Sequence, residues 1–383
     1  MDRLGLSLGL CLFLAHPSTA TPQAAPLTKL QRAEILRAIT QYQQEQRLPA
    51  ISVAIGVRGE LALVRAQGLA QIENRVRATP ATRFRSASTL KPLTATLILQ
   101  LAVRHQLTLS ADFHRYCPAF PDQRYSITIE QLLLHQGGVR GSDAADIFVR
   151  DHYSSVSQAL GRFAGDSLRF PPGTGQLYSN YGYVLLACAI EGITGLPYDR
   201  ALRESLLIPL AMTRTAPVDM YRVQANRASS YLLRTAENTK TWEGVWTSAH
   251  LAASPLDTAF PADPIDPSFA IGAGNYLSTP SDMVRFVLAL DTGRLLPPAM
   301  RDLETIPQPA PPGTTSRPIG WAVSSYDSIT VSQVFGSDWN GSFALVWDPT
   351  YHLAIAIASN LNWNQPRGLV QNILRILRRA RHE

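Results

Sequence analysis

A serine and a lysine three residues apart stand at the start of one of the most apolar runs of this chain. In the stretch RFRSASTLKPLTA (83–95), Lys91 follows Ser88 and is the only charged residue between Ser86 and Val103. Residues three apart are neighbours on one helix face, so a helix that begins near Ser88 places the two side chains together. Pro92 fits such a start, because proline lacks an N–H group and is tolerated in a first helical turn.

If the pair is buried, the lysine can act as a base for the serine. A lysine among apolar side chains is desolvated, which lowers the pKa of its ammonium group from about 10.4, and the positive end of the helix dipole acts in the same direction. Such a lysine can accept a proton from the neighbouring serine, and N–H groups at the helix start can stabilise an oxyanion. The alternative is that Lys91 extends to the surface and Ser88 is a helix N-cap. The pair alone leaves both interpretations open.

A second polar pair precedes another apolar helix. In FPPGTGQLYSNYGYVLLACAIEGITG (170–195), Tyr178 and Asn180 are two residues apart, so they can converge on one point only from a loop. A tyrosine near a lysine can act as acid or base for a leaving group, and an asparagine amide can hold a substrate carbonyl. The alternative for Tyr178 is aromatic packing. Between the two blocks, ITIEQLLLHQGGVRG (127–141) predicts a short helix, and we expect its His135 to bond backbone groups rather than to act as a base.

These side chains need elements to hold them, and the apolar periodicity predicts where the elements lie. A first helix carries Leu30, Ile35, Ile39 and Tyr42, and a β-hairpin follows in ISVAIGVRGELALVRAQGLA (51–70). Helices are predicted near 88–105, 127–135, 155–164, 181–194 and 198–208. Four strands follow in RPIGWAVSSY, SITVSQVF, SFALVWDP and HLAIAIASNL, and QPRGLVQNILRILRRA closes the chain as a helix.

This order predicts an α+β fold. One antiparallel sheet is assembled from both ends of the chain, N- and C-terminal helices flank it, and a mostly helical subdomain is inserted. We expect the α/β part at about 27–85 and 270–383, and the helical part at about 86–269. The Pro-rich segment 215–268 is too long for a plain connection, so we expect it to take part in substrate selection.

The bulk composition narrows the class of protein. The chain has 383 residues, 45% of them hydrophobic, and its net charge of +6 comes from scattered arginines, so we expect a small-molecule or peptide substrate and no nucleic-acid partner. The segment MDRLGLSLGLCLFLAHPSTATPQ indicates a signal peptide at 1–20, because its apolar run is shorter than the about 20 residues of a membrane span. We therefore expect a periplasmic or secreted protein without stable membrane insertion of the mature chain.

Cysteine and histidine spacing bears on disulfides and metals. Cys117 and Cys188 remain after removal of the signal peptide; they could pair, but we favour two free, buried thiols. None of the eight histidines stands in an HxH, HExxH or Cys-His spacing, so we expect no metal and no cofactor.

In their order along the chain, these blocks resemble the serine β-lactamase and penicillin-binding-protein superfamily, in particular its branch of class C β-lactamases, D-alanyl-D-alanine carboxypeptidases and related esterases. The resemblance runs from about residue 30 to 375 and rests on TRFRSASTLKPLTATLILQLA, ITIEQLLLHQGGV, PPGTGQLYSNYGYVLLACAIEGITG, IPLAMTRT and GNYLSTPSDMVRF. It implies a β-lactamase-like serine hydrolase domain over 27–383. In that domain Ser88 would be the acylated nucleophile, Lys91 its base, Tyr178 a proton relay to the leaving group, and Asn180 a contact of substrate and lysine.

The third block departs from the family pattern. The family has Lys or His before Thr/Ser-Gly on the strand that lines the site, whereas VSQVFGSDWNGSFALVWDP (331–349) contains neither lysine nor histidine. Ser337 is the nearest polar candidate for substrate binding, and a second oxyanion N–H is expected from about this position. The missing cation disfavours substrates that present a carboxylate there.

The function that the resemblance implies is hydrolysis, through an acyl-enzyme, of an amide or ester: a β-lactam, a D-Ala-D-Ala peptide or a carboxylic ester. The alternative is a non-catalytic protein of the same fold that binds cell-wall peptides or a protein partner.

Overall fold

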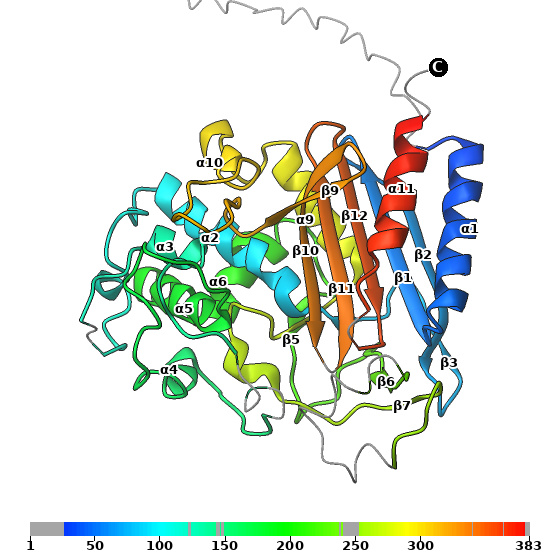
Figure 1. Ribbon diagram of the computed structural model, residues 1–383, viewed down its shortest axis with the longest axis horizontal. Coiled ribbons are helices and arrows are strands. Elements are labelled where there is room, and N and C mark those ends of the chain that lie inside the picture. The colour runs from blue at the N-terminus through cyan, green and yellow to red at the C-terminus, as the bar shows by residue number, and fades with distance from the viewer. Residues whose placement is uncertain are drawn as a thin grey trace, which may run out of the picture.

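The centre of the fold is a seven-stranded antiparallel sheet that both ends of the chain build (Figure 1). The computed structural model describes residues 27–121, 124–142, 146, 149–236, 239, 253–338, 340–362 and 364–379, and the predicted signal peptide at 1–20 lies outside them. The strands are β1 (Ala50–Val57), β2 (Glu60–Gln71), β3 (Val76–Arg77), β9 (Ala322–Tyr326), β10 (Ile329–Asp338), β11 (Gly341–Asp348) and β12 (Leu353–Ser359). Their order is β3-β2-β1-β12-β11-β10-β9, which confirms the predicted α+β fold with a sheet made from both chain ends.

Large and small apolar side chains alternate along the strands, so the two faces of the sheet differ. In β12, Leu353, Ile355 and Ile357 belong to one apolar cluster, whereas the alanines between them at 354, 356 and 358 belong to another. Helices α1 (Lys29–Glu45) and α11 (Arg367–Arg379) cover the face with the branched side chains and lie side by side there (Figure 1). Helix α9 (Pro280–Asp291) packs on the alanine face, where small side chains let a helix approach closely.

The first helix differs in one detail from its prediction. Ile35 and Ile39 are fully buried, as the spacing predicted, but Leu30 is 67% exposed. Leu30 lies in the first turn of α1 and points to solvent, although Leu27 just before the helix belongs to the buried cluster.

The helical part lies on the other side of α9 from α1 and α11 (Figure 1). It contains α2 (Lys91–Val103), α3 (Ile129–Leu133), α4 (Val156–Leu160), α5 (Asn180–Thr194), α6 (Tyr198–Leu202) and α10 (Pro298–Asp302), with a π-helical turn at Arg203–Leu207 and short 3-10 turns η1 (Ala87–Leu90), η2 (Phe113–Arg115) and η5 (Pro267–Ala270). Helices α2 and α5 are buried on nearly every side because their sequences are apolar all round. No helix among the described residues is both long and apolar enough to span a membrane.

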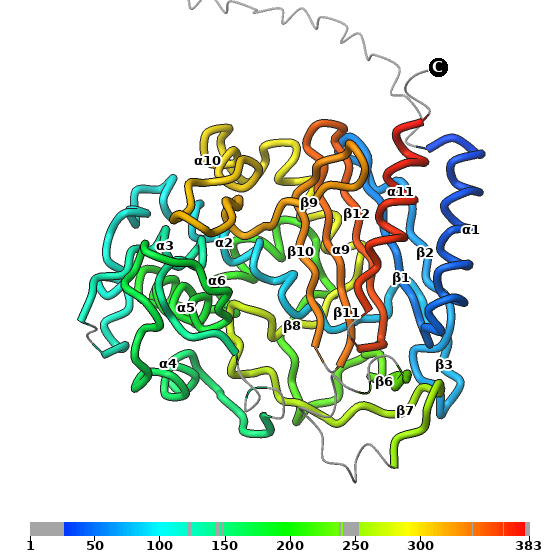
Figure 2. Tube along the Cα trace, viewed as in Figure 1, coloured from blue at the N-terminus to red at the C-terminus, as the bar shows by residue number. Residues whose placement is uncertain are grey.

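Short strands connect the two parts. Strands β4 (Phe84–Arg85), β8 (Tyr276–Ser278) and β5 (Ala216–Pro217) form a small sheet, and β6 (Tyr231–Leu233) pairs with β7 (Ala259–Pro261). Figure 2 shows that β6 and β7 lie below the end of the seven-stranded sheet, so the long segment predicted to help select substrate runs from the helical part to the sheet and back.

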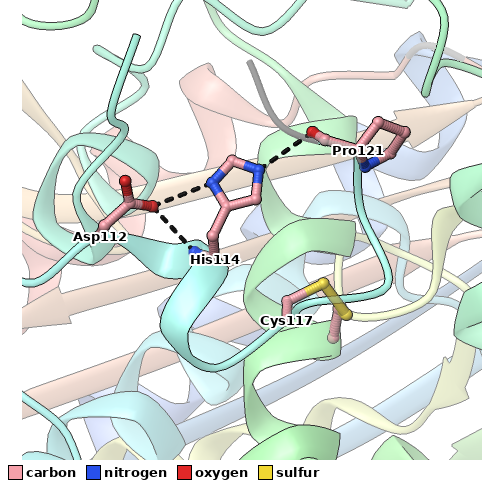
Figure 3. The surroundings of a disulfide bond; sticks show 5 residues. Asp112, His114, Cys117 and Pro121 are labelled. Carbon is pink, nitrogen blue, oxygen red and sulfur yellow. Dashed lines mark hydrogen bonds and ion pairs between the residues drawn. A yellow bond between two sulfur atoms is a disulfide. The ribbon is translucent and has the colours of Figure 1, made fainter. Parts of the chain in front are cut away.

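Cys117 and Cys188 form a disulfide, so the prediction of two free thiols was wrong (Figure 3). Gly192 lies one turn after Cys188 in α5, and a Cβ atom there would stand 1.9 Å from the carbonyl oxygen of Tyr116. The missing side chain therefore lets the backbone beside Cys117 contact α5. The imidazole of His114 bridges the carboxylate of Asp112 and the carbonyl of Pro121, at 3.0 Å each, and so fixes the loop around Cys117.

Candidate active site

Ser88 lies in a strained turn in front of α2. The turn η1 is a 3-10 helix with about three residues per turn, which sets Ser88 directly above Lys91. Ala87 has φ of 43°, a left-handed conformation that costs a residue with a side chain on the order of 1 kcal/mol or more. Two hydrogen bonds hold this backbone: the N–H and the hydroxyl of Ser86 both donate to the carbonyl of Tyr276 in β8, at 2.9 and 3.0 Å. Ser88 itself is half-buried and remains accessible.

Lys91 does not extend to the surface, because its side chain is 2% exposed. Its Nζ atom lies 3.2 Å from Ser88 Oγ, and it donates to Asn180 Oδ1 at 2.7 Å and to the carbonyl of Ala273 at 3.0 Å. Burial lowers the pKa of Lys91, the nearby Tyr178 hydroxyl opposes this, and the positive charge of Arg317 adds to the lowering. Two of the three Nζ partners can only accept, so a neutral Lys91 has its lone pair left for the Ser88 hydroxyl.

Tyr178 points to the same oxygen atom from the solvent side. Its hydroxyl donates to Ser88 Oγ at 2.7 Å, and its side chain is 46% exposed. His135 binds the backbone of the residues before and after Tyr178. Its carbonyl accepts from Leu177 N–H at 2.9 Å, and its Nδ1 accepts from Ser179 N–H at 3.2 Å. The two rings also pack, with centroids 4.6 Å apart.

The structural role predicted for His135 agrees with these contacts. Burial lowers the pKa of His135 well below its ordinary value, and the charges of Arg317 and Lys91 act in the same direction. A neutral imidazole with Nδ1 as an acceptor is the form that this environment stabilises.

Asn180 connects the lysine to a neighbouring loop. It is the first residue of α5, one residue inside the helix rather than in the preceding loop as predicted. Its Oδ1 accepts from Lys91 and its Nδ2 donates to Ser142 Oγ at 2.8 Å, so the two contacts fix which way the amide faces. The hydroxyl of Ser179, which caps α5, accepts from Gly182 N–H at 3.0 Å and sets where the helix begins.

The third block runs along the free edge of β10 beside the nucleophile. Ile329 pairs with Tyr326 across a two-residue turn, and the pairing with β9 stops at Gln333. The closing pair of such a hairpin is hydrogen-bonded and the bonding direction alternates along a strand. Residue 337 therefore has its backbone N–H on the edge away from β11, where β9 no longer covers it. A Cβ atom on Gly336 would stand 2.4 Å from the carbonyl of Ser86 and 2.8 Å from the N atom of Ser88, so this edge touches the nucleophile's turn directly.

Two cavities lie at the site, one lined by Ser88 itself and one lined by its partners Lys91 and Tyr178. We call the first, of about 280 Å³, the Asn180 cavity; it is lined by Ser88, Asn180, Ser142, Arg85, Ser337, Asp338, Asp146, Ile265, Pro267 and Phe269, among others. We call the second, of about 340 Å³, the Tyr178 cavity; it is lined by Lys91, His135, Tyr178, Tyr183, Arg317, Trp321, Phe335 and Arg367, among others. Ile265 and Pro267 show that part of the segment predicted to select substrate reaches the site.

The structure thus brings all five predicted residues, Ser88, Lys91, Tyr178, Asn180 and Ser337, to one place. Sequence reasoning missed the carbonyl of Ala273, the hydroxyl of Ser142 and the two arginines of the Tyr178 cavity. A carbonyl carries no sequence signal, and single polar residues in loops have no periodicity to mark them. The segment GAGN around Ala273 was the one available hint, because paired glycines allow close backbone approach.

Known proteins share these blocks. Protein flp of Staphylococcus aureus (strain N315) is 30% identical over 194 residues, which are 50% of this chain and 39% of that protein, so the match spans well under half of its length. The teichoic acid D-alanine hydrolase of Staphylococcus aureus is 24% identical over 306 residues, 80% of this chain and 69% of that protein.

Solved structures share the fold. A D-amino acid amidase from Ochrobactrum anthropi SV3, complexed with D-phenylalanine, superposes with a TM-score of 0.79 at 22% identity over 92% of this chain and 100% of that one. A family model described as Beta-lactamase matches residues 35–379, a range that contains both cavities and every residue of the site. The chain therefore belongs to the beta-lactamase family.

Proposed function

We propose that this protein is a serine hydrolase that acts through an acyl-enzyme on Ser88. The observation that carries the proposal is the position of Ser88 Oγ, 3.2 Å from the Nζ of a buried lysine and 2.7 Å from a tyrosine hydroxyl. The family and several of its neighbours are hydrolases, which supports the same class of reaction.

The first half of the proposed reaction acylates the serine. Lys91 is neutral and takes the proton of Ser88 as Oγ attacks the substrate carbonyl. The backbone N–H groups of Ser88 and Ser337 donate to the oxyanion that forms. The proton then passes from Lys91 to Tyr178 and on to the leaving group, whose bond to the carbonyl carbon breaks.

The second half releases the acyl group. Water attacks the ester carbonyl from the side vacated by the leaving group, and Tyr178 with Lys91 takes its proton. The proton returns to Ser88 Oγ as the acyl–oxygen bond breaks, which restores the starting state. Asn180 holds the lysine and an acyl-group amide, and the apolar wall of the Asn180 cavity receives the rest of the acyl group.

Two relatives narrow the acyl groups to be tested first. One acts on D-amino acid amides by its name and the other removes D-alanine from teichoic acid by its name. A D-aminoacyl ester or amide is therefore the first substrate to try, followed by a β-lactam and a D-Ala-D-Ala peptide.

Labelling tests the nucleophile. A fluorophosphonate probe followed by peptide mapping should mark the peptide with Ser88, and Ser88→Ala should remove the label, whereas Ser325→Ala, an exposed serine on β9, should keep it. Label that persists in Ser88→Ala would overturn the assignment. A chromogenic ester should give a burst equal to the amount of enzyme; binding without turnover would favour the non-catalytic alternative.

We also propose that the protein works outside the cytoplasm, as one catalytic unit from residue 27 onward. The Cys117–Cys188 disulfide supports this, because such bonds persist in oxidising compartments. Cell fractionation with N-terminal sequencing of the mature protein tests it, and the reduced, uncleaved chain in the cytoplasm would contradict it.

A further inference from the structure

The two backbone N–H groups proposed to bind the oxyanion belong to parts of the chain that are far apart in sequence. Ser88 lies in the turn η1 before α2, and Ser337 lies near the end of β10. Two donors stabilise one oxyanion only if both reach the same oxygen atom, and a shift of about 1 Å in a supporting element can lower a rate about a hundredfold. The distance between η1 and the end of β10 therefore decides whether both donors can act.

The sheet holds the end of β10 from one side. Its pairing with β9 stops at Gln333, and beyond that point it pairs with β11. The hydroxyl of Ser337 lies 3.4 and 3.5 Å from two oxygen atoms of β11, which are long contacts. On the free side, a Cβ atom on Gly336 would stand 2.4 Å from the carbonyl oxygen of Ser86. This close contact fixes how near β10 can come to η1, but it does not prevent the two from moving apart.

An ion pair connects the same two elements. Arg85 is the last residue of β4, just before η1, and its side chain is 4% exposed. Its Nε and Nη2 atoms donate to Asp338 Oδ2 at 3.2 and 2.5 Å, and Asp338 directly follows Ser337 on β10. Hydrogen bonds between two charged groups are shorter and stronger than those between neutral groups. The pair therefore opposes a movement of the end of β10 away from the nucleophile's turn.

Both partners of the ion pair are fixed at their other end. The backbone of Arg85 pairs with Leu277 of β8. The second carboxylate oxygen of Asp338 accepts from Asn340 N–H at 2.8 Å, and the side-chain amide of Asn340 donates to the carbonyl of Asp263 at 3.0 Å. The pair thus joins two anchored segments, so a change in its length is passed to the neighbouring Ser337.

We propose that Arg85 and Asp338 are positioning residues, which hold the N–H group of Ser337 at the distance from Ser88 that the oxyanion requires. This role rests on the proposed function, because the oxyanion forms only if Ser88 is acylated. The Gly336 contact sets the lower limit of the distance and the ion pair sets the upper limit. The ion pair acts on the reaction through the backbone of Ser337.

Kinetics of Asp338→Asn are the first test, because the amide keeps an oxygen for Asn340 and loses the charge. With the methyl ester of 3-acetoxybenzoate, kcat per active site, counted from the burst, should fall about ten- to a hundredfold. The value of kcat/KM should fall by the same factor, since the lost interaction belongs to the transition state. Arg85→Lys should lower kcat less, because lysine keeps the charge but has one donor nitrogen.

Two exposed sites supply the matched controls. Asp327→Asn breaks an exposed ion pair with Arg375. Arg203→Lys changes an exposed arginine that lines a different cavity. Both variants should keep the wild-type kcat.

The carbonyl stretch of the acyl-enzyme separates positioning from a general loss of stability. Rapid mixing with 4-nitrophenyl acetate, with and without carbon-13 at the carbonyl, isolates this band in the infrared difference spectrum. Two N–H donors polarise the carbonyl, so the wild-type band should lie below that of the free ester, and the Asp338→Asn band should move back toward it. Asp327→Asn should keep the wild-type band.

The outcomes distinguish the positioning role from the proposed function. An unchanged kcat in Asp338→Asn, or a lower kcat with the carbonyl band of the wild type, would overturn the positioning role while Ser88 labelling still stands. Absence of a burst and of Ser88 labelling in the wild type would overturn the proposed function as well.

Discussion

The two cavities beside Ser88 both contain arginine near their walls, and they differ in what faces it. At the Asn180 cavity Asp338 accepts two hydrogen bonds from Arg85, and Asp146 is paired with Arg140 and Arg162. At the Tyr178 cavity Arg367 contacts the Phe335 ring and the Gln365 amide, and the Nε atom of Arg317 is buried without a hydrogen-bond partner. The electrostatic character of a site is therefore set by the pairing of its charges, which a count of charged residues does not reveal.

The largest effect should come from the lysine whose amine contacts the nucleophile. Lys91→Met removes the proposed base and should lower kcat/KM by about 10²- to 10⁴-fold, measured with the methyl ester of 3-acetoxybenzoate. Lys29→Met is the control, because Lys29 is an exposed lysine at the start of α1 and should leave the rate unchanged. A rate within threefold of the wild type would show that Lys91 is not the base.

Asp338→Asn should leave an arginine without an acidic partner at the Asn180 cavity, as at the Tyr178 cavity. Arg85, whose side chain is 4% exposed, would lose its partner, so the free energy of unfolding should fall by about 3 kcal/mol, the low end for breaking a buried pair because Asp338 is partly exposed. Urea unfolding measures this. The ratio of kcat/KM for a 4-nitrophenyl glutarate monoester over the pentanoate ester should rise about tenfold.

The matched control for this change is Asp327→Asn, which breaks a solvent-exposed pair with Arg375 and should leave the urea midpoint almost unchanged. Equal losses of stability in the two variants, with no change in acyl preference, would show that pairing does not distinguish the cavities.

Glu304 bears on the comparison of the two cavities, because its carboxyl group lies beside Trp321 of the Tyr178 cavity. A protonated carboxyl group there carries no negative charge to balance the arginines. Burial raises its pKa to about 8, although the Thr96 hydroxyl, which donates to it at 2.8 Å, acts in the opposite direction. Since the folded pKa lies above the ordinary value near 4.5, the unfolded chain ionises first, and stability is lost as the pH rises from about 4.5 to 8.

Glu304→Gln should remove this loss, which is on the order of 5 kcal/mol for a pKa raised from 4.5 to about 8. Thermal unfolding between pH 5 and pH 9 should show a smaller decline in Tm for the variant than for the wild type. Glu204→Gln, an exposed residue paired with Arg200, should keep the wild-type decline. Parallel curves for Glu304→Gln and the wild type would mean that the carboxyl group is ionised in the folded state.

The smallest effect concerns the influence of Arg317, in the Tyr178 cavity, on the pKa of the proposed base Lys91. Burial is the main cause of the lowered pKa of Lys91, and Arg317 adds to it. Arg317→Gln should therefore raise the pKa of Lys91 and move the acid limb of the kcat/KM profile to higher pH, measured with a neutral ester. Arg203→Gln should leave the limb in place, and a shift to lower pH in Arg317→Gln would contradict the assigned direction.

The sheet and the central helices were predictable because buried side chains make apolar residues recur at the spacing of a strand or a helix. The alternation of isoleucine and alanine in HLAIAIASNL marks a strand between two layers, and the run after Lys91 marks a helix buried on every side. Ser88 and Lys91 were predictable for the same reason, since the turn η1 continues directly into the apolar helix α2 and this fixes their distance.

The remaining parts of the site depend on contacts between distant loops. Arg317 lies far from Lys91 in sequence and reaches it only through the loop that precedes β9, and Cys117 meets Cys188 across 71 residues because Gly192 lets two backbones approach. Neither contact produces a periodic pattern of residues from which it could be predicted. The third block accordingly suggested a missing cation, whereas the fold supplies cations from two other segments.

The disulfide divides the proposed catalytic set in a way that matters for handling the protein. The loop it closes, from residue 117 to 188, contains Tyr178, Asn180 and His135, whereas Ser88 and Lys91 lie outside it. Protein made in a reducing host would keep Ser88 and Lys91 on the adjoining elements η1 and α2 but lose the covalent bond that closes the loop with Tyr178 and Asn180. Recombinant material for any of these measurements is therefore best produced by secretion and checked for free thiols first.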